Sequence, residues 1–387
     1  MAFDVDDTDA APPRPSGGGG GGGRGDADDG DDGDRRVRSD RLPGPDVVRA
    51  VALIGVVVMN YHGYLIIRGG DRDGGALAEF FDPWTGPLGT RFAATFVLVA
   101  GVGVTLLTRR VWSPDLVTIA RWQLARRGLV LYLLGLLLDR IWPGTIILYY
   151  GAMFAIGALL FTLRTRWVLV IGAVAVALGA AISAWIFDRR VEGESVAWLT
   201  SPGATSVRGI VFDVFVNGTH PLLPWLGFLC VGIVIGRHLD APQLHLTLVG
   251  AGLVLFAAAT LLSSLGSTAR GEHLLSTDAG SRSVVYVASA LGTALIAFGA
   301  LSWAAERWTT ALDPLRRAGQ LSLTIYVAHI LLFNLVVDWL DLVQPGGVGT
   351  SLAAASVFWI VAIVAATCWH RRFGRGPCER AYRALAG

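Results

Sequence analysis

Apolar stretches long enough to cross a lipid bilayer recur along this chain from residue 46 to residue 370, and they constrain its fold more than any other feature. Hydrophobic residues make up 53% of the sequence and charged residues only 16%, which argues against a soluble protein of this length. Since a transmembrane helix needs about 20 predominantly apolar residues, the pattern predicts an all-α, polytopic integral membrane bundle of about ten transmembrane helices. The predicted spans are 46–67, 88–107, 124–139, 145–163, 167–187, 221–238, 244–264, 284–304, 318–339 and 350–370.

Arginine residues are unevenly distributed among the loops between these spans. If the N-terminus lies in the cytosol, most arginines fall in cytosolic loops, in agreement with the positive-inside rule. An even number of spans then returns the C-terminus to the same side. We therefore predict a multi-pass protein with both termini in the cytosol. The arginines that would be cytosolic are Arg109, Arg110, Arg121, Arg126, Arg127, Arg164, Arg166, Arg237, Arg307, Arg316, Arg317, Arg371, Arg372 and Arg375.

The composition divides the chain into three parts. Residues 1–40 are rich in Gly and Asp and offer almost nothing apolar to bury, which predicts a disordered cytosolic tail. Residues 41–372 hold all of the spans, and residues 373–387 are expected to form a cytosolic C-terminal tail. The start of the chain has no apolar h-region, so we expect no cleaved signal peptide and expect the first span to direct insertion.

The first span carries polar residues at both ends of one helical face. At about 100° per residue, Asp46, Arg49 and Asn60 fall within about 60° of one another, and Arg49 and Asn60 are separated by roughly 16 Å. Polar groups within the membrane are costly unless they face protein or water, so this face should point into the bundle. We expect a continuous polar passage between the two sides of the membrane; alternatively, Asp46 and Arg49 only anchor the helix at the headgroups.

Three histidines are candidates for proton transfer near neutral pH. His62 lies near the outer end of the first span, and we expect it to border the same cavity as Asn60, although the two residues lie about 200° apart on a regular helix. His329 lies in the middle of the ninth span on the same face as Tyr326. A hydrogen bond to a neighbouring group would also explain His329, and an interfacial structural role would also explain His220.

Three long outer segments, 68–87, 188–219 and 265–283, are expected to fold over a substrate chamber. Candidate substrate-binding residues at this side are Arg91, Asp82, Trp84 and His220. On the cytosolic side, Arg121, Arg126 and Arg127 cluster near Arg49, and guanidinium groups suit a phosphorylated ligand because they offer paired donors. The positive-inside bias alone would also place arginines there. The spacing of Cys230, Cys368 and Cys378 predicts neither a metal site nor a disulfide.

Several segments resemble the heparan-alpha-glucosaminide N-acetyltransferase family and its bacterial relatives, including a YeiB-like group of unknown function. The opening of the first span, Leu-Pro-Gly-Pro-Asp-Val-Val-Arg, resembles the Leu-Asp-x-x-Arg-Gly motif of that family, with Ala50 in place of the Gly. The resemblance covers most of residues 41–383. The segments that carry it are 42–61, 91–104, 147–154, 224–237, 319–326 and 374–383.

This resemblance implies a transmembrane acyltransferase in the bacterial cytoplasmic membrane. Acetyl-CoA or another acyl-CoA would serve as co-substrate, held by Arg49, Arg121, Arg126 and Arg127, and its acyl group would pass to a sugar-like or cell-envelope acceptor on the far side. Asn60 matches a family Asn that lies eleven residues after the motif Arg. The family's His in the next loop has no counterpart in 68–87, so the catalytic candidates are Asn60, His62 and His329.

Two other functions remain open at this point. The same buried polar groups would serve a transporter of a small polar or anionic solute, and a non-catalytic membrane scaffold is the third possibility. The expected partners are the lipid bilayer and a sugar-like or envelope acceptor. Neither a metal nor a nucleic acid is expected, and the sequence leaves a homodimer open.

Overall fold

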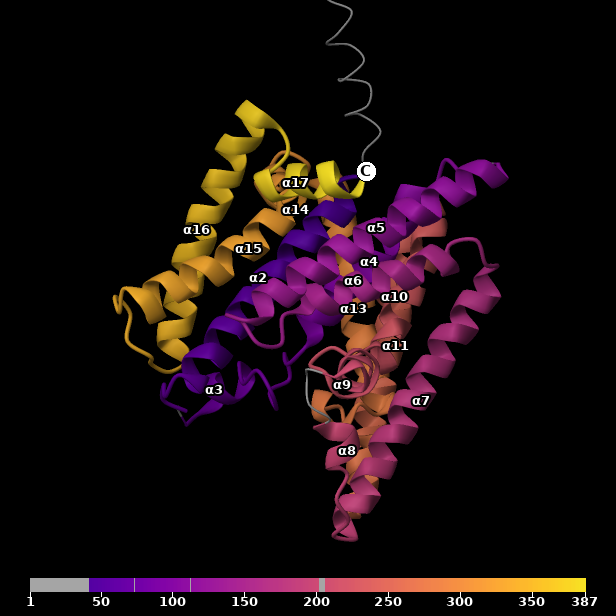
Figure 1. Ribbon diagram of the computed structural model, residues 1–387, viewed down its shortest axis with the longest axis vertical. Helices are drawn as coiled ribbons and strands as arrows, with labels where there is room; N and C mark the ends of the chain where they lie inside the picture. Colours follow the sequence, from indigo (N-terminus) through magenta and orange to yellow (C-terminus); the bar gives the residue numbers. More distant parts are fainter. Residues whose placement is uncertain (1–41, 73, 112, 202–205) are drawn as a thin grey trace, which may run out of the picture. The chain divides into compact units, whose positions relative to one another are not determined.

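The computed structural model describes residues 42–72, 74–111, 113–201 and 206–387, and residues 43–387 form one compact unit (Figure 1). The predicted tail at residues 1–40 lies outside the described residues. Over the described ranges the chain is helical and contains no strand, which confirms the predicted all-α class. A π-helical turn, η3 (Asn334–Trp339), continues the ninth span. The main helices are α2 (Pro43–Ile67), α4 (Arg91–Thr108), α5 (Pro114–Asp139), α6 (Ile146–Leu160), α7 (Thr165–Val191), α10 (Leu222–Arg237), α11 (Leu244–Ser263), α13 (Val284–Arg307), α15 (Ser322–Phe333) and α16 (Val348–Phe373).

Each of the ten predicted spans corresponds to one of these helices, but they are not equally suited to cross a membrane. Within the described residues, seven are long and apolar enough to do so, and an eighth span results if the bent pair Val207–Asn217 and Leu222–Arg237 is counted as one. Helix α6 has only 15 residues. Helix α5 is long, but the three arginines of the predicted cytosolic cluster lie between its start and its middle, at positions 121, 126 and 127.

Short helices occupy the connections between the spans. Several of them begin with a side-chain cap, which satisfies backbone N–H groups that a helix start leaves unpaired. The Ser206 and Thr268 hydroxyls accept from the N–H groups of Gly209 and Gly271 at the starts of α9 and α12. The short helices are α3 (Ala76–Phe80), α8 (Ala197–Thr200), α9 (Val207–Phe212), η1 (Asp213–Asn217), α12 (Ala269–Leu275), η2 (Ala279–Ser281), α14 (Asp313–Gln320) and α17 (Pro377–Ala386).

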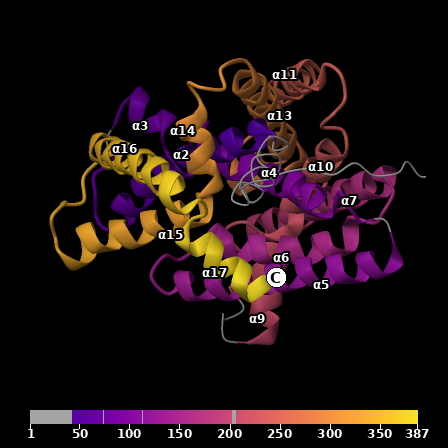
Figure 2. The ribbon, with the colours of Figure 1, turned by 90° about the horizontal axis from the view of Figure 1, so that it is seen from above.

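Helix α2 is the hub of the bundle. It packs against α4, α13, α14, α15 and α16, whereas α11 packs mainly on α13 and α5 mainly on α6. Figure 2 shows the pair α11 and α13 on one side of the central helices, the pair α5 and α6 on the opposite side, and α15 and α16 at a third side. Helix α17, in the segment expected as a tail, packs against α5 and α15.

Helices α4 and α10 approach each other especially closely, and glycines make this possible. A Cβ atom on Gly232 would lie 2.0 Å from the Leu98 carbonyl oxygen, and one on Gly101 would lie 2.2 Å from the Leu229 carbonyl oxygen. Small residues at such positions let the backbones of membrane helices come into van der Waals contact. The contact fixes the start of α4 beside the start of α10, where both helices border the cavity described next.

Candidate functional site

A cavity of about 930 Å³ lies at the end of the bundle formed by the C-terminal part of α2 and the first turns of α4, α10 and α13. We call this the Asn60 cavity. The three long segments that are expected to fold over a substrate chamber all contribute to the walls of this cavity, whereas its use by a substrate stays a prediction. They supply residues 83–85, 216–219 and 278–280, among others. The other polar and aromatic wall residues include Asn60, Tyr64, Thr90, Trp142, His220, Trp225, His273, Arg282, Tyr286 and Tyr326.

Asn60 joins α2 to α15 at the wall of this cavity. Its side-chain Nδ2 lies 3.2 Å from Nε2 of His329, and the neighbouring Tyr61 hydroxyl donates to the His329 carbonyl oxygen at 3.2 Å. An amide nitrogen can only donate, so Nε2 of His329 accepts in this contact, and Nδ1 of the same ring is buried without a partner among the described residues. His329 itself is fully buried and is not part of the cavity wall. It therefore contacts the cavity through Asn60.

His62 does not border the cavity, so the expected pairing of His62 with Asn60 is wrong. The side chain is buried, and its Nδ1 lies 2.8 Å from the Phe81 carbonyl oxygen, to which it donates. Both residues could face one chamber only if the first span unwound, but α2 continues without a break to Ile67. His62 instead fixes the segment that leads to Asp82. Burial raises the pKa of Asp82. The hydrogen bonds from the N–H groups of Thr85 and Trp84, together with the nearby His62, lower this pKa by more than burial raises it, so that the net shift is downward.

Of the four candidate substrate-binding residues, Trp84 and His220 line the cavity, whereas Arg91 and Asp82 do not. The His220 ring packs against Trp225 at 4.7 Å between centroids, and its Nδ1 has no hydrogen-bond partner among the described residues. Arg91 donates to the carbonyl oxygens of Pro87 and Thr277, so it ties α4 to the segment before α13. Asp82 accepts from the backbone N–H groups of Trp84 and Thr85 in a local turn.

Sequence reasoning missed several polar wall residues. The Tyr286 hydroxyl lies 2.7 Å from the Thr90 hydroxyl, and the Tyr326 hydroxyl lies 3.0 Å from the Thr145 hydroxyl. Tyr326 shares a helical face with His329, so its spacing in the sequence could have identified it as a site residue. Tyr286 is an isolated tyrosine in an apolar helix, and no pattern in the sequence marks it.

Arg282 completes this wall from the loop before α13. Its guanidinium group donates to the carbonyl oxygens of Val216 and Gly218, the latter at 2.9 Å. Burial lowers the pKa of Arg282, and nearby Tyr149, Tyr286 and Asp213 partly offset that effect. Arg282 therefore holds the turn that precedes His220 in place at the cavity wall.

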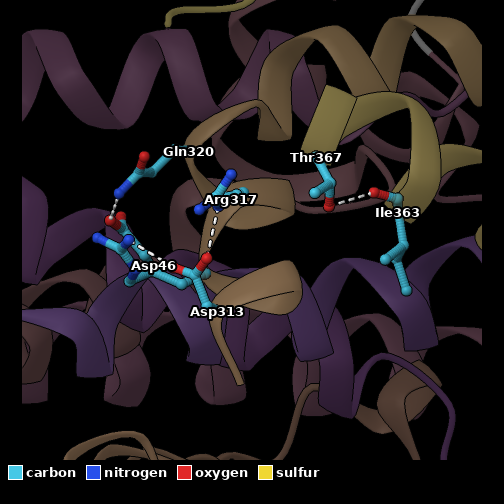
Figure 3. Close-up of polar contacts among 7 residues, drawn as sticks. Asp46, Asp313, Arg317, Gln320, Ile363 and Thr367 are labelled. Atoms are coloured by element: carbon cyan, nitrogen blue, oxygen red, sulfur yellow. Dashed lines mark hydrogen bonds and ion pairs between the residues drawn. The ribbon is translucent and has the colours of Figure 1, made fainter. Parts of the chain in front are cut away.

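The opposite end of α2 carries a compact polar cluster. Arg49 pairs with Asp46 at 3.2 Å, and Gln320 of α14 donates to the second oxygen of Asp46 at 2.8 Å. Figure 3 shows Gln320 reaching Asp46, with Asp313 and Arg317 paired beside them on α14. Asp46 thus binds α14 to α2 through Gln320 while it pairs with Arg49, which is more than the headgroup anchor considered above.

The predicted cofactor-binding arginines of α5 have protein partners. Arg121 is exposed and donates to the Thr162 hydroxyl at 3.0 Å. Arg126 and Arg127 donate to the carbonyl oxygens of Ala386 and Gly387, so they hold the end of α17. The Arg127 Nε is buried and has no partner within the described chain.

The expected continuous passage along α2 is not formed. The wall of the Asn60 cavity begins on α2 at Val56 and does not include Arg49. Leu53, which lies between them on the same helical face, is fully buried. Aliphatic packing therefore separates the Arg49 cluster from the cavity, because Leu53 and Val56 replace the polar residues that a passage would need.

In the part of the chain that the structure describes, no three His, Cys, Asp or Glu side chains are grouped so that they could hold a metal ion. The profile of the family described as "Heparan-alpha-glucosaminide N-acetyltransferase, catalytic" matches residues 41–269, which is more than half of the chain. A second profile, "Protein of unknown function (DUF418)", matches residues 234–387. No curated protein matches the chain. By the first of these matches, the chain, a multi-pass membrane protein, belongs to the heparan-alpha-glucosaminide N-acetyltransferase catalytic family.

Proposed function

We propose that this protein is a membrane-embedded acyltransferase that moves an acetyl or other acyl group from cytosolic acyl-CoA to an extracytoplasmic sugar or cell-envelope acceptor. The observation that carries the proposal is the contact between Asn60 and His329 at the wall of the Asn60 cavity. A membrane protein places a half-buried amide and a buried imidazole together at a cavity wall only at a cost in free energy, which a binding or catalytic role would justify. The family of the chain supplies the reaction class.

Acyl transfer from a thioester requires a proton acceptor and a group that stabilises the oxyanion. An amine or hydroxyl of the acceptor attacks the thioester carbonyl carbon, a new C–N or C–O bond forms, the C–S bond breaks, and CoA leaves as a thiolate. In this proposal His220, which borders the cavity, takes the proton of the attacking group. The Asn60 amide donates to the oxyanion, and His329 acts behind it as a positioning residue.

The donor would bind at the Arg49 end of the bundle. Arg49, Arg121 and Arg127 offer guanidinium groups for the phosphates of CoA. The thioester must then cross the layer of Leu53 and Val56 to meet an acceptor in the cavity. At about 1.5 Å per residue, the helical distance from Arg49 to Asn60 is roughly 16 Å. Transfer therefore requires this aliphatic layer to open when acyl-CoA binds.

The decisive experiment measures whether CoA binds and whether binding depends on Arg49. Thermal unfolding of the purified full-length protein is followed with and without acetyl-CoA, because a ligand present at about 100 times its Kd stabilises the folded state by about 2.7 kcal/mol. Arg49→Gln should abolish the shift. Arg110→Gln, a change at an exposed arginine, is the matched control and should retain it.

An acetyl-transfer assay in proteoliposomes with amino-sugar acceptors completes the test. Label from acetyl-CoA supplied on the Arg49 side should appear on the acceptor supplied on the other side. Solute uptake that is coupled to protons and is indifferent to CoA would instead show a transporter. That result, together with an absent CoA shift, would overturn the proposal.

A further inference from the structure

A second cavity, of about 860 Å³, lies between α15 and α16. Tyr61 and Phe358 line this cavity but not the Asn60 cavity. Helix α16 packs on α2 and α14, and the space between it and α15 forms a groove with α2 as its floor. The groove does not share wall residues with the Asn60 cavity, and none of its wall residues has been given a role in the proposed transfer. We call it the α15–α16 groove.

The walls of the groove are almost wholly apolar. The polar atoms of its few polar side chains are mostly engaged elsewhere: the Tyr61 hydroxyl donates to the His329 carbonyl oxygen, and Trp369 Nε1 donates to the Arg375 carbonyl oxygen at 3.0 Å. The Thr324 hydroxyl donates to Glu379 at 2.5 Å. Water finds few partners on such walls, so the occupant must be apolar. The aliphatic and aromatic wall residues include Leu65, Ile325, Ala328, Leu332, Phe333, Val336, Ala354, Val357, Val361, Ala362 and Ala365.

The groove is continuous with the surface that α16 presents to lipid. Val357 and Val361 line it and are exposed, and Ile360 and Val364 continue the exposed aliphatic surface around the same helix. The wall residues on α16 run from Thr350 to Trp369, which at about 1.5 Å per residue is roughly 28 Å, close to the roughly 30 Å thickness of the hydrocarbon core. A chain from the surrounding bilayer can therefore enter from the side and lie along the helices.

Positive charge gathers at one end of the groove. The Arg380 guanidinium lies 5.6 Å from the ring centroid of Trp369, a wall residue, and Arg375 is held beside the same ring through its carbonyl oxygen. Both side chains are exposed, and neither forms an ion pair with any described residue. Each arginine near a membrane surface contributes about 1 kcal/mol to the free energy of binding to acidic headgroups. An anionic headgroup fits this end of the groove.

We propose that the α15–α16 groove binds an acidic phospholipid, with an acyl chain between α15 and α16 and the headgroup phosphate on Arg375 and Arg380. The bound chain packs against Tyr61 and Phe358, whose rings lie 6.1 Å and 6.4 Å from the His329 ring. Occupancy of the groove thus supports the wall that holds His329.

Photolabelling tests the assignment. The full-length protein is reconstituted in vesicles that contain either phosphatidylglycerol or phosphatidylcholine with the same diazirine-bearing acyl chain, and labelled peptides are mapped. Phosphatidylglycerol should label peptides from Ser322–Phe333 and Val348–Phe373 at least about fivefold more than phosphatidylcholine does, as one charge contact of about 1 kcal/mol requires. The double change Arg375→Gln and Arg380→Gln should remove this preference. The control pair Arg109→Gln and Arg110→Gln, at the end of α4, should keep it.

A change that fills the groove tests where the acyl chain lies. Ala328→Phe combined with Ala362→Phe should abolish labelling of both helices, whereas Val364→Phe, on the exposed surface of α16 outside the groove, should leave it intact. The wild-type comparison of the two lipids remains decisive if the filled variant fails to fold. Three outcomes would overturn the proposal: equal labelling by both lipids, labelling spread evenly over exposed α7 and α11, or loss of a dimer in the filled variant. The last outcome would assign the groove to a second copy of the chain.

Discussion

Asn60 and His329 lie 269 positions apart in the sequence, and their side-chain nitrogens meet at 3.2 Å between α2 and α15. The contact ties the first span to the ninth at the wall of the Asn60 cavity. The amide nitrogen donates in this contact and Nε2 of the imidazole accepts. Any change to Asn60 therefore acts on the cavity surface and on a buried histidine at once.

Replacing Asn60 with Leu should reduce acyl transfer at least about 100-fold, because the amide donor is lost. The same change leaves Nε2 of His329 buried without a partner, which should lower the free energy of unfolding by about 1–3 kcal/mol. Turnover and thermal unfolding measure the two effects. Met59→Leu, a change of similar volume at the neighbouring wall position, is the control. Wild-type turnover in Asn60→Leu would contradict the proposed role.

His220 and His62 should respond differently to substitution. His220→Gln removes the imidazole that borders the cavity and should reduce transfer by about 10²–10⁴-fold, the usual contribution of a general base. His62→Gln should leave turnover near the wild-type value, because His62 contacts the Phe81 carbonyl oxygen outside the cavity. Initial rates at saturating acetyl-CoA distinguish them. Equal losses in both variants would return His62 to the catalytic candidates.

Glu379 should stabilise the start of α15. Its carboxylate accepts from the N–H groups of Leu323 and Thr324 at 2.8 Å and 3.1 Å, so it acts as a cap supplied by α17. Glu379→Ala should cost about 1 kcal/mol and release α17, which limited proteolysis at Arg380 and Arg383 would reveal. Glu306→Ala, an exposed change, serves as the control. Unchanged proteolysis in Glu379→Ala would show that α17 is held mainly by other contacts.

Gly232→Ala should disrupt the contact between α4 and α10, because the added methyl group would lie 2.0 Å from the Leu98 carbonyl oxygen. We expect a loss of about 1–3 kcal/mol in unfolding free energy, typical of overpacking. Gly250→Ala, which has nothing within 4 Å, should be neutral or stabilise α11 by up to about 1 kcal/mol. Thermal unfolding in detergent compares the two. Similar behaviour of both variants would mean that α4 and α10 can move apart cheaply.

Acidification should loosen α12 from α7. His273 of α12 stacks on Phe187 and hydrogen-bonds Ser183, and burial lowers its pKa below the ordinary 6.5, partly offset by Ser183, Asp188 and Asp278. His273 therefore binds a proton less readily when α12 is docked on α7 than when it is released. The contribution of His273 to docking is complete above about pH 6.5, and it is lost as the pH falls from there through the lowered pKa. Hydrogen exchange of residues 269–275, compared between about pH 7.5 and about pH 5, the range in which histidine titrates, measures the effect. His273→Gln should remove the pH dependence, and its persistence would assign it to another group.

The fold was predictable from the sequence because the bilayer allows few solutions. An apolar run of about 20 residues must be helical to satisfy its backbone, and all ten predicted spans are helical. Their unequal lengths were less predictable: α6 is short, and η3 continues α15 as a π-helix rather than an α-helix. Such details depend on packing against neighbours, which local pattern does not encode.

The candidate site was only partly predictable. Asn60 was found through its place on one face of α2, and Trp84 and His220 through their loops. The partner of Asn60 could not be chosen from the sequence, because nothing local relates position 60 to position 329. The role of Arg126 and Arg127 in holding α17 was missed for a similar reason: an arginine at the cytosolic end of a helix looks the same whether it binds phosphate or a backbone carbonyl.

The aliphatic layer at Leu53 and Val56 has a further consequence for the cell. A polar chamber sunk into a membrane protein threatens the ion gradients on which the cell depends, since a water-filled path from end to end would let protons leak. With Leu53 fully buried between Arg49 and the chamber, aliphatic side chains interrupt any water-filled path along this face of α2. In the proposed transfer, whatever opens the layer must therefore fill it at the same moment, so that the acyl group crosses while the membrane stays sealed.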